Sequence, residues 1–286
     1  MLFSCRQLFA VSGSGKTRLS LEGLCKNWGI YLSCRAGLGT ASGANDIKEA
    51  NAAFVSMTAT NCLDSSSKPN DRQRNILAAR RAYSQLLCAR VFVLKTLLEK
   101  IPFGTTADSA RRRWVLLQIL PPFIQEDLFV TVLRAIRGGV TDILQNITST
   151  MLNGLAKKCP NLFPRPTGLF AVVDEAQEAV KHLQSYFRSD NDLDSRPILR
   201  EIVGSLEISG IFSGVILSGT GLSLPAVQRA LSSSSAKSGR RRHTFINTGC
   251  FTKASQEVYI KSYLTLSDSP SDQRLLERIQ HWLIGR

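Results

Sequence analysis

Residues 8–29, LFAVSGSGKTRLSLEGLCKNWG, decide the fold class. A short apolar run at residues 7–11 favours a strand, and the two glycines that follow favour a tight turn. Leucines then recur at helical spacing within residues 17–28, and residues 30–34 form a second apolar run. Strand, glycine-rich turn, helix and strand in this order predict an α/β fold with a mainly parallel sheet.

The turn between the first strand and the first helix has the composition of a phosphate-binding loop. It reads AVSGSGKT at residues 10–17, with alanine where the usual pattern begins with glycine. Gly13 and Gly15 allow consecutive backbone amides to point inward, and the following helix directs its positive end at the same anion. Lys16 would reach the terminal phosphates and the Thr17 hydroxyl would hold Mg²⁺. The loop therefore predicts binding of a nucleoside triphosphate.

A second acidic motif supplies the partner that such a loop needs. Residues 169–173 are five consecutive apolar residues, which favour a strand buried on both faces, and Asp174 and Glu175 follow directly. An aspartate at the carboxyl end of a strand beside the loop can hold Mg²⁺, and the adjacent glutamate can deprotonate the attacking water. The alternative is structural, with Asp174 capping a helix at residues 175–187.

A third strand is predicted at residues 211–217 and ends in a polar tip. Ser218 or Thr220 would then lie near the terminal phosphate and sense it. The alternative is a plain glycine-containing turn at residues 218–221.

Hydrophobic spacing predicts further elements along the chain. Residues 35–45 and 61–74 are expected to be loops, and residues 111–120 fit a helix or a strand equally well. A serine-rich and then basic loop is expected at residues 231–242, with a strand at 244–247. Helices are predicted at residues 75–101, 127–137, 140–155, 197–206 and 273–284.

Composition restricts the class of partner without selecting one. The 286 residues include 36 Lys and Arg against 22 Asp and Glu, a formal net charge of +14, which favours anionic partners. The arginines at 240–242 indicate a solvated loop or a patch for nucleic acid or nuclear import. Seven scattered cysteines without a CxxC pair favour an intracellular protein, cytoplasmic or nuclear, with reduced thiols. No apolar run is long enough to span a membrane.

Four stretches together resemble the P-loop NTPase region of fungal Crinkler-like proteins, which are related to the AAA+/STAND ATPases. They are SGSGKTRLSLEGLCKNWGIYLSCRA, RRRWVLLQILPPF, LFAVVDEAQEAV and VILSGTGLSL. The resemblance implies a three-layer P-loop NTPase fold with a helical insertion. We expect one domain over residues 1–286, with its core at 1–66 and 167–266, the insertion at about 70–160 and a partial helical lid at 268–286.

The resemblance also implies a set of site residues. Magnesium would be held by Thr17 and Asp174, and hydrolysis of ATP, or of GTP, would depend on Glu175 and Lys16. The nucleotide-binding residues would be Ser12, Gly13, Ser14, Gly15, Lys16, Thr17, Arg18 and Thr220. We expect slow turnover that serves as a conformational switch, and a homo-oligomer or a protein partner.

Two other functions remain open at this stage. A helicase-like motor on nucleic acid is suggested by the Asp-Glu-Ala-Gln string at residues 174–177 and by the basic charge, although no second motor core follows residue 248. A truncated nucleotide-binding module without turnover is suggested by the absence of a tail after the last predicted helix.

Overall fold

The computed structural model describes the chain in segments separated by gaps. The described residues are 4–9, 15–35, 43–58, 69–120, 127–163, 168–187, 196–220, 225, 227–228, 241–245, 253–261 and 264–283. Five strands run through them, β1 (Ser4–Phe9), β2 (Gly29–Ser33), β3 (Leu169–Asp174), β4 (Phe212–Gly219) and β5 (Arg241–Phe245). The helices discussed below are α1 (Lys16–Lys26), α2 (Asp46–Thr58), α3 (Pro69–Lys100), α4 (Ala107–Ile119), α5 (Leu128–Ala135), α6 (Thr141–Lys158), α7 (Ala176–Lys181), α8 (Leu199–Ile208), α10 (Lys253–Lys261) and α11 (Pro270–Leu283).

The five strands form one open sheet in the order β2-β3-β4-β1-β5. Every neighbouring pair is parallel, so all carboxyl ends lie at the same edge. The predicted α/β arrangement with a parallel sheet is therefore confirmed. In this order the chain goes from β1 to β2 at the far end of the sheet and then returns through β3 and β4. A reversal of this kind leaves a crevice at the carboxyl edge, where ligands bind in open α/β sheets.

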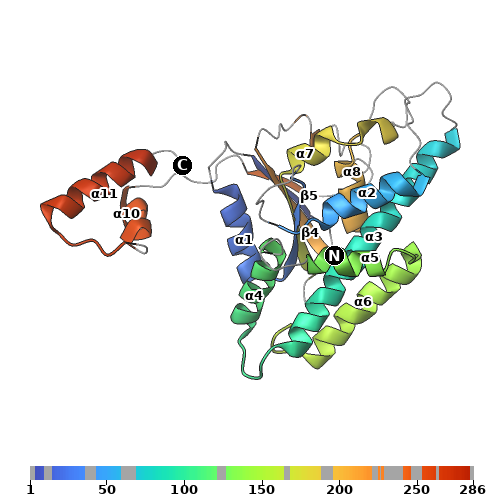
Figure 1. Ribbon diagram of the computed structural model, residues 1–286, viewed down its shortest axis with the longest axis horizontal. Coiled ribbons are helices and arrows are strands. Elements are labelled where there is room, and N and C mark those ends of the chain that lie inside the picture. Colours follow the sequence, from blue (N-terminus) through green and yellow to red (C-terminus); the bar gives the residue numbers. More distant parts are fainter. Residues whose placement is uncertain are drawn as a thin grey trace.

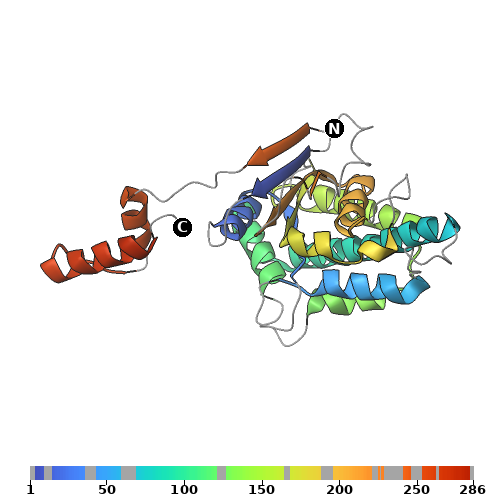
Figure 2. The ribbon, with the colours of Figure 1, turned by 90° about the horizontal axis from the view of Figure 1, so that it is seen from above.

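Helices cover both faces of the sheet because successive strand residues point to opposite sides (Figure 1). Tyr31 and Val172 pack with Leu24 of α1 and Val115 of α4 on one face. The alternating neighbours in the strands join a larger core on the other face, where α2, α3, α7 and α8 lie. Viewed from above, β1 and β5 lie side by side at one side of the molecule (Figure 2).

Helix α4 covers the outer edge of β2 with its side chains. Trp114 Nε1 donates to the Gly29 carbonyl at 2.6 Å, and the Gln118 side-chain oxygen accepts from the Tyr31 amide at 2.8 Å. Both backbone groups face away from β3, the strand with which β2 pairs. Side chains of α4 thus make the hydrogen bonds that a further strand would make.

Several elements differ from the sequence prediction. Helix α2 was not predicted, and α3 begins at Pro69, inside the predicted loop, because proline is well suited to the first helical position. The ambiguous segment at residues 111–120 belongs to a helix that begins earlier, where the Thr106 side chain caps it by accepting from the Ser109 amide at 3.2 Å. Helices α3 to α6 contribute to the same core as the sheet, so the division into a core and an insertion stays a prediction.

Two further predictions about the second half of the chain are wrong. Arg241 and Arg242 lie in β5 rather than in a loop, because backbone pairing with β1 does not depend on their charge. The predicted helix at residues 175–187 is short: α7 ends at Lys181, and Leu183 has a left-handed backbone with φ 54° before a single 3₁₀ turn at Gln184–Tyr186. The rest of this predicted loop, residues 231–240, lies outside the described residues.

Candidate functional site

Asp174, the last residue of β3, accepts hydrogen bonds from three hydroxyl groups at the carboxyl edge of the sheet. The Thr17 hydroxyl in the first turn of α1 donates to Oδ2 at 2.9 Å, although the two residues are 157 positions apart. The Tyr31 hydroxyl of β2 donates to the same oxygen at 2.6 Å, and Ser218 of β4 donates to Oδ1. The carboxylate is buried, with 3% of the residue exposed.

The sheet explains why these groups meet. Strand β3 lies between β2 and β4, so Tyr31 and Ser218 come from its two neighbours. Asp174 follows Val172 by two residues, and Val172 faces α1, so the period of two directs the aspartate to the same face. The predicted capping role of Asp174 is wrong, since residue 175 occupies the cap position of α7 and its side chain makes no capping bond.

Lys16 is the first residue of α1 and lies against this acidic site. It follows Gly15, whose φ of 82° is a left-handed conformation that glycine adopts without strain. Only 6% of Lys16 is exposed. Burial lowers the pKa of its ammonium group, and the nearby carboxylates of Glu175 and Asp174 act in the opposite direction. The positive charge and the two carboxylates therefore share one small region.

Glu175, directly after β3, has an unusual backbone conformation. Its φ of 53° is left-handed, which costs about 1–3 kcal/mol in a residue other than glycine. Gln177 donates from its Nε2 to the Glu175 carboxylate. The other atom of this carboxamide, Oε1, is buried and has no hydrogen-bond partner among the described residues. A Cβ atom on Gly219 would lie 2.0 Å from that oxygen, so Gly219 leaves the space that Gln177 fills.

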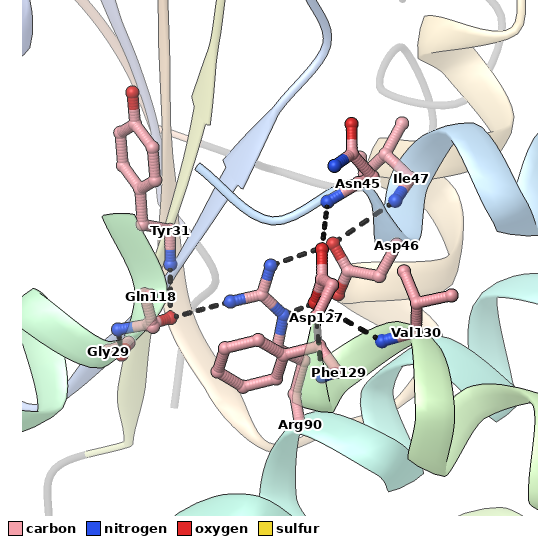
Figure 3. A network of polar contacts seen from close by, with 10 residues as sticks. All are labelled: Gly29, Tyr31, Asn45, Asp46, Ile47, Arg90, Gln118, Asp127, Phe129 and Val130. Atoms are coloured by element: carbon pink, nitrogen blue, oxygen red, sulfur yellow. Dashed lines mark hydrogen bonds and ion pairs between the residues drawn. The ribbon is translucent and has the colours of Figure 1, made fainter. Parts of the chain in front are cut away.

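A buried polar network fixes the strand that carries Tyr31 (Figure 3). Arg90 of α3 forms a two-pronged ion pair with Asp46 of α2, and its Nη2 donates to Asp46 Oδ1 at 2.7 Å. Arg90 Nη1 donates at 3.2 Å to the Gln118 oxygen that also accepts from the Tyr31 amide. The guanidinium lies over the Phe129 ring, 4.0 Å from its centroid. One residue of β2 thus joins this network to the Asp174 carboxylate.

The structure brings together four of the predicted site residues: Lys16, Thr17, Asp174 and Glu175. Arg18 is exposed and pairs with Glu22 at 2.7 Å, and its guanidinium lies 4.9 Å from the centre of the Tyr259 ring in α10.

Of the remaining predicted residues, some are described elsewhere in the fold and others lie outside the described residues. Thr220 lies just beyond β4 and is exposed, whereas Ser218, the other predicted tip residue, makes the bond to Asp174. Ser12, Gly13 and Ser14 lie outside the described residues, and so does Ala10.

Sequence reasoning missed Tyr31 and the contact of Gln177 with Glu175. Tyr31 stands in an apolar run that predicts a strand, but only the pairing of β2 with β3 shows that its hydroxyl reaches Asp174. Gln177 lies two residues after Glu175, so the sequence alone could have indicated that the two side chains are close. The contact of Gln177 with Gly219 could not be predicted, because it depends on the position of β4.

The Thr17 hydroxyl and the Asp174 carboxylate could hold a magnesium ion. They are too few to form a metal site made of protein ligands alone. Mg²⁺ is usually bound by one or two carboxylates, with water and substrate phosphates completing its octahedron. The Thr17 hydroxyl and the Asp174 carboxylate are hard oxygen donors already in contact. In the part of the chain that the structure describes, no three His, Cys, Asp or Glu side chains are grouped as a metal site would require.

Comparison with known proteins adds no family to this picture. No protein-family model matches the sequence, and the search of curated proteins finds no significant match. Among the described helices, none combines the length and the apolar character needed to cross a membrane.

Proposed function

We propose that this chain is a P-loop NTPase that binds a nucleoside triphosphate, ATP in the first instance, together with Mg²⁺ and hydrolyses it. The observation that carries the proposal is the 2.9 Å hydrogen bond between Thr17, at the start of α1, and Asp174, at the end of β3. A hydroxyl after a glycine–lysine turn and an aspartate at the end of a buried strand are the two oxygen ligands that Mg²⁺-triphosphate sites use. That this arrangement of sheet and helices is the three-layer P-loop NTPase fold is part of the proposal.

Each residue of the site has a defined part in this reaction. Lys16 lies partly desolvated at the positive end of α1, where its charge supports binding of the terminal phosphates. Thr17 and Asp174 would hold Mg²⁺, which when bound neutralises charge that develops on the phosphates. The hydroxyls of Tyr31 and Ser218 keep the Asp174 carboxylate in a fixed orientation, because each donates to it from a neighbouring strand.

Glu175 and Gln177 would handle the attacking water. Glu175, the carboxylate next to Asp174, would accept a proton from this water. Gln177 Oε1, which has no hydrogen-bond partner within the described part of the chain, can accept a hydrogen bond from a water molecule while Nε2 holds Glu175. The use of the cycle as a conformational switch, and its slow rate, belong to the same proposal.

Two substitutions separate binding from chemistry. Lys16→Ala is expected to weaken binding of a fluorescent ATP analogue by on the order of a hundredfold, because a charge-assisted contact to phosphate is lost. Glu175→Gln is expected to retain binding and to lower the steady-state rate of phosphate release at least about a hundredfold. Lys26→Ala, at the exposed end of the same helix, is the matched control and should change neither quantity.

The same titration made with a fluorescent GTP analogue measures the base preference. If Lys16→Ala binds both nucleotides as tightly as the parent chain does, the phosphate-loop assignment is wrong. If Glu175→Gln turns over at the parent rate, the assignment of Glu175 as the base is wrong even though binding stands.

A further inference from the structure

A cavity opens at the carboxyl edge of the sheet beside the end of β2, on the face that α2 covers and opposite to α1. It has a volume of about 530 Å³ and lies between the end of β2, helix α2 and the end of α7. Cavities that bind small organic molecules usually measure about 300–1,000 Å³. The cavity is therefore large enough for a ligand of its own.

The inner part of this cavity is apolar. Cys34 and Ile47 are buried there, and Val55 and Leu183 extend the apolar wall toward the surface. Burial raises the pKa of the Cys34 thiol, and the carboxylates of neighbouring residues add to the shift, so the thiol is neutral at physiological pH. The inner wall thus suits a hydrocarbon or aromatic group and does not suit an anion.

The outer rim of the cavity carries positive charge. Arg35 and Lys48 are exposed lining residues, and the His182 side chain, which is also half exposed, lines the same cavity. Among the described lining residues, none is acidic. The ligand that fits this distribution has an anionic group at the rim and an apolar body inside.

The carboxylates that lie near the cavity are engaged by other groups. Glu178 lies 3.4 Å from the Lys181 ammonium and 3.8 Å from His182, and Asp46 is in the buried ion pair with Arg90. Asp174 accepts its three hydroxyl hydrogen bonds on the far side of the strand. These pairings leave the rim cations of Arg35 and Lys48 available to an incoming anion.

We propose that this cavity is a binding site for a small organic anion with an apolar body, such as a carboxylate or phosphate ester, separate from the triphosphate site. The cavity adjoins the catalytic region through two backbone connections. The Cys34 amide donates to the Asp174 carbonyl at 2.9 Å, and the six-residue helix α7 leads from Glu175 to His182. The occupant therefore contacts the two segments that hold the acidic residues in place.

Binding can be measured with 8-anilinonaphthalene-1-sulfonate, a fluorescent anion with an aromatic body. Its uncharged counterpart, N-phenyl-1-naphthylamine, has the same aromatic groups without the sulfonate. Ala52 lines the cavity from an exposed position on α2, so Ala52→Trp should fill the cavity without disturbing the core. This variant is expected to weaken binding of the sulfonate at least about tenfold, because the tryptophan occupies the space of the aromatic body.

The rim charge is tested separately. Lys48→Glu should weaken binding of the sulfonate by on the order of tenfold and leave the uncharged probe unaffected, because only the charged probe interacts with the rim cation. Lys157→Glu changes the net charge by the same amount on an exposed position of α6 and should have no effect. Thermal melting of each variant verifies that it is folded.

The outcomes separate this proposal from the proposed nucleotide site. Lys16→Ala should bind the sulfonate as the parent does, whether or not that variant has lost ATP binding. Parent-like affinity of the sulfonate for Ala52→Trp would place the probe elsewhere and overturn the proposal. Equal weakening of both probes by Lys48→Glu, or weakening of the sulfonate by Lys157→Glu, would overturn the assignment of the rim to an anionic group.

Discussion

Replacing Tyr31 with phenylalanine tests whether its hydroxyl stabilises an ionised carboxylate inside the protein. The substitution keeps the ring of a residue that is only 2% exposed, and it removes only the donor that lies 2.6 Å from Asp174 Oδ2. Hydrogen bonds to charged groups contribute about 1.5–3 kcal/mol to stability. Since Thr17 and Ser218 still donate to the carboxylate, the loss should lie in the lower half of this range, about 1.5–2 kcal/mol.

Tyr83 provides a matched control within the same fold. It is as deeply buried, with 3% exposed, and its hydroxyl donates at 2.6 Å to the side-chain oxygen of Asn51, which is neutral. Tyr83→Phe should therefore cost about 0.5–1.5 kcal/mol. Urea denaturation measures the free energy of unfolding of each variant. If the dependence on urea concentration has the same slope in both, the difference between their midpoints gives the difference in stability. A loss for Tyr31→Phe that is no greater than the loss for Tyr83→Phe would refute the reasoning.

Three further substitutions test other parts of the structure. Arg90→Met leaves its aspartate partner buried and uncompensated and should lower the free energy of unfolding by about 3–5 kcal/mol in urea denaturation; a loss below about 1 kcal/mol contradicts this. Gly219→Ala should displace Gln177 and lower ATP turnover, whereas Gly154→Ala, whose added Cβ atom meets open space, should leave turnover unchanged. Equal turnover rates for the two variants would show that the contact between Gly219 and Gln177 does not affect turnover. The pKa of the Cys34 thiol is raised in the folded state, so the free energy of unfolding should fall as pH rises above the unfolded thiol value of about 8.5. The fall should reach up to about 1.4 kcal/mol per pH unit, and Cys34→Ala should make it smaller. An unchanged pH dependence in Cys34→Ala would contradict this role of the thiol.

The parts of the site that sequence could predict are those with local patterns. The glycine–lysine–threonine turn stands between a strand and a helix, and Asp174 ends an unbroken apolar run, so both could be placed at strand ends. Because parallel strands end at one edge, their proximity followed from the fold class. That Tyr31 and Ser218 would flank Asp174 did not follow, because the order of strands in a sheet is set by packing between distant segments.

The fold shows the same division between local and distant information. The start of α3 at Pro69 could have been predicted, since proline favours the first helical turn. The preceding serines led instead to the prediction of a loop. Helix α2 buries Ile47, Ala50 and Phe54, which recur at helical spacing, so the sequence contained a signal for this helix that the prediction did not use. Strand β5 begins with basic residues, and its place beside β1 depends on a pairing that composition does not reveal.

The hydrogen bonds that Trp114 and Gln118 make to β2 have a consequence for association between molecules. A strand from a second polypeptide cannot add to β2 while these two side chains occupy its outward amide and carbonyl groups. The sheet is thereby protected on this side against edge-to-edge aggregation and strand exchange. Copies of the chain that joined through a continuous sheet would do so beside β5, at the opposite end of the strand order.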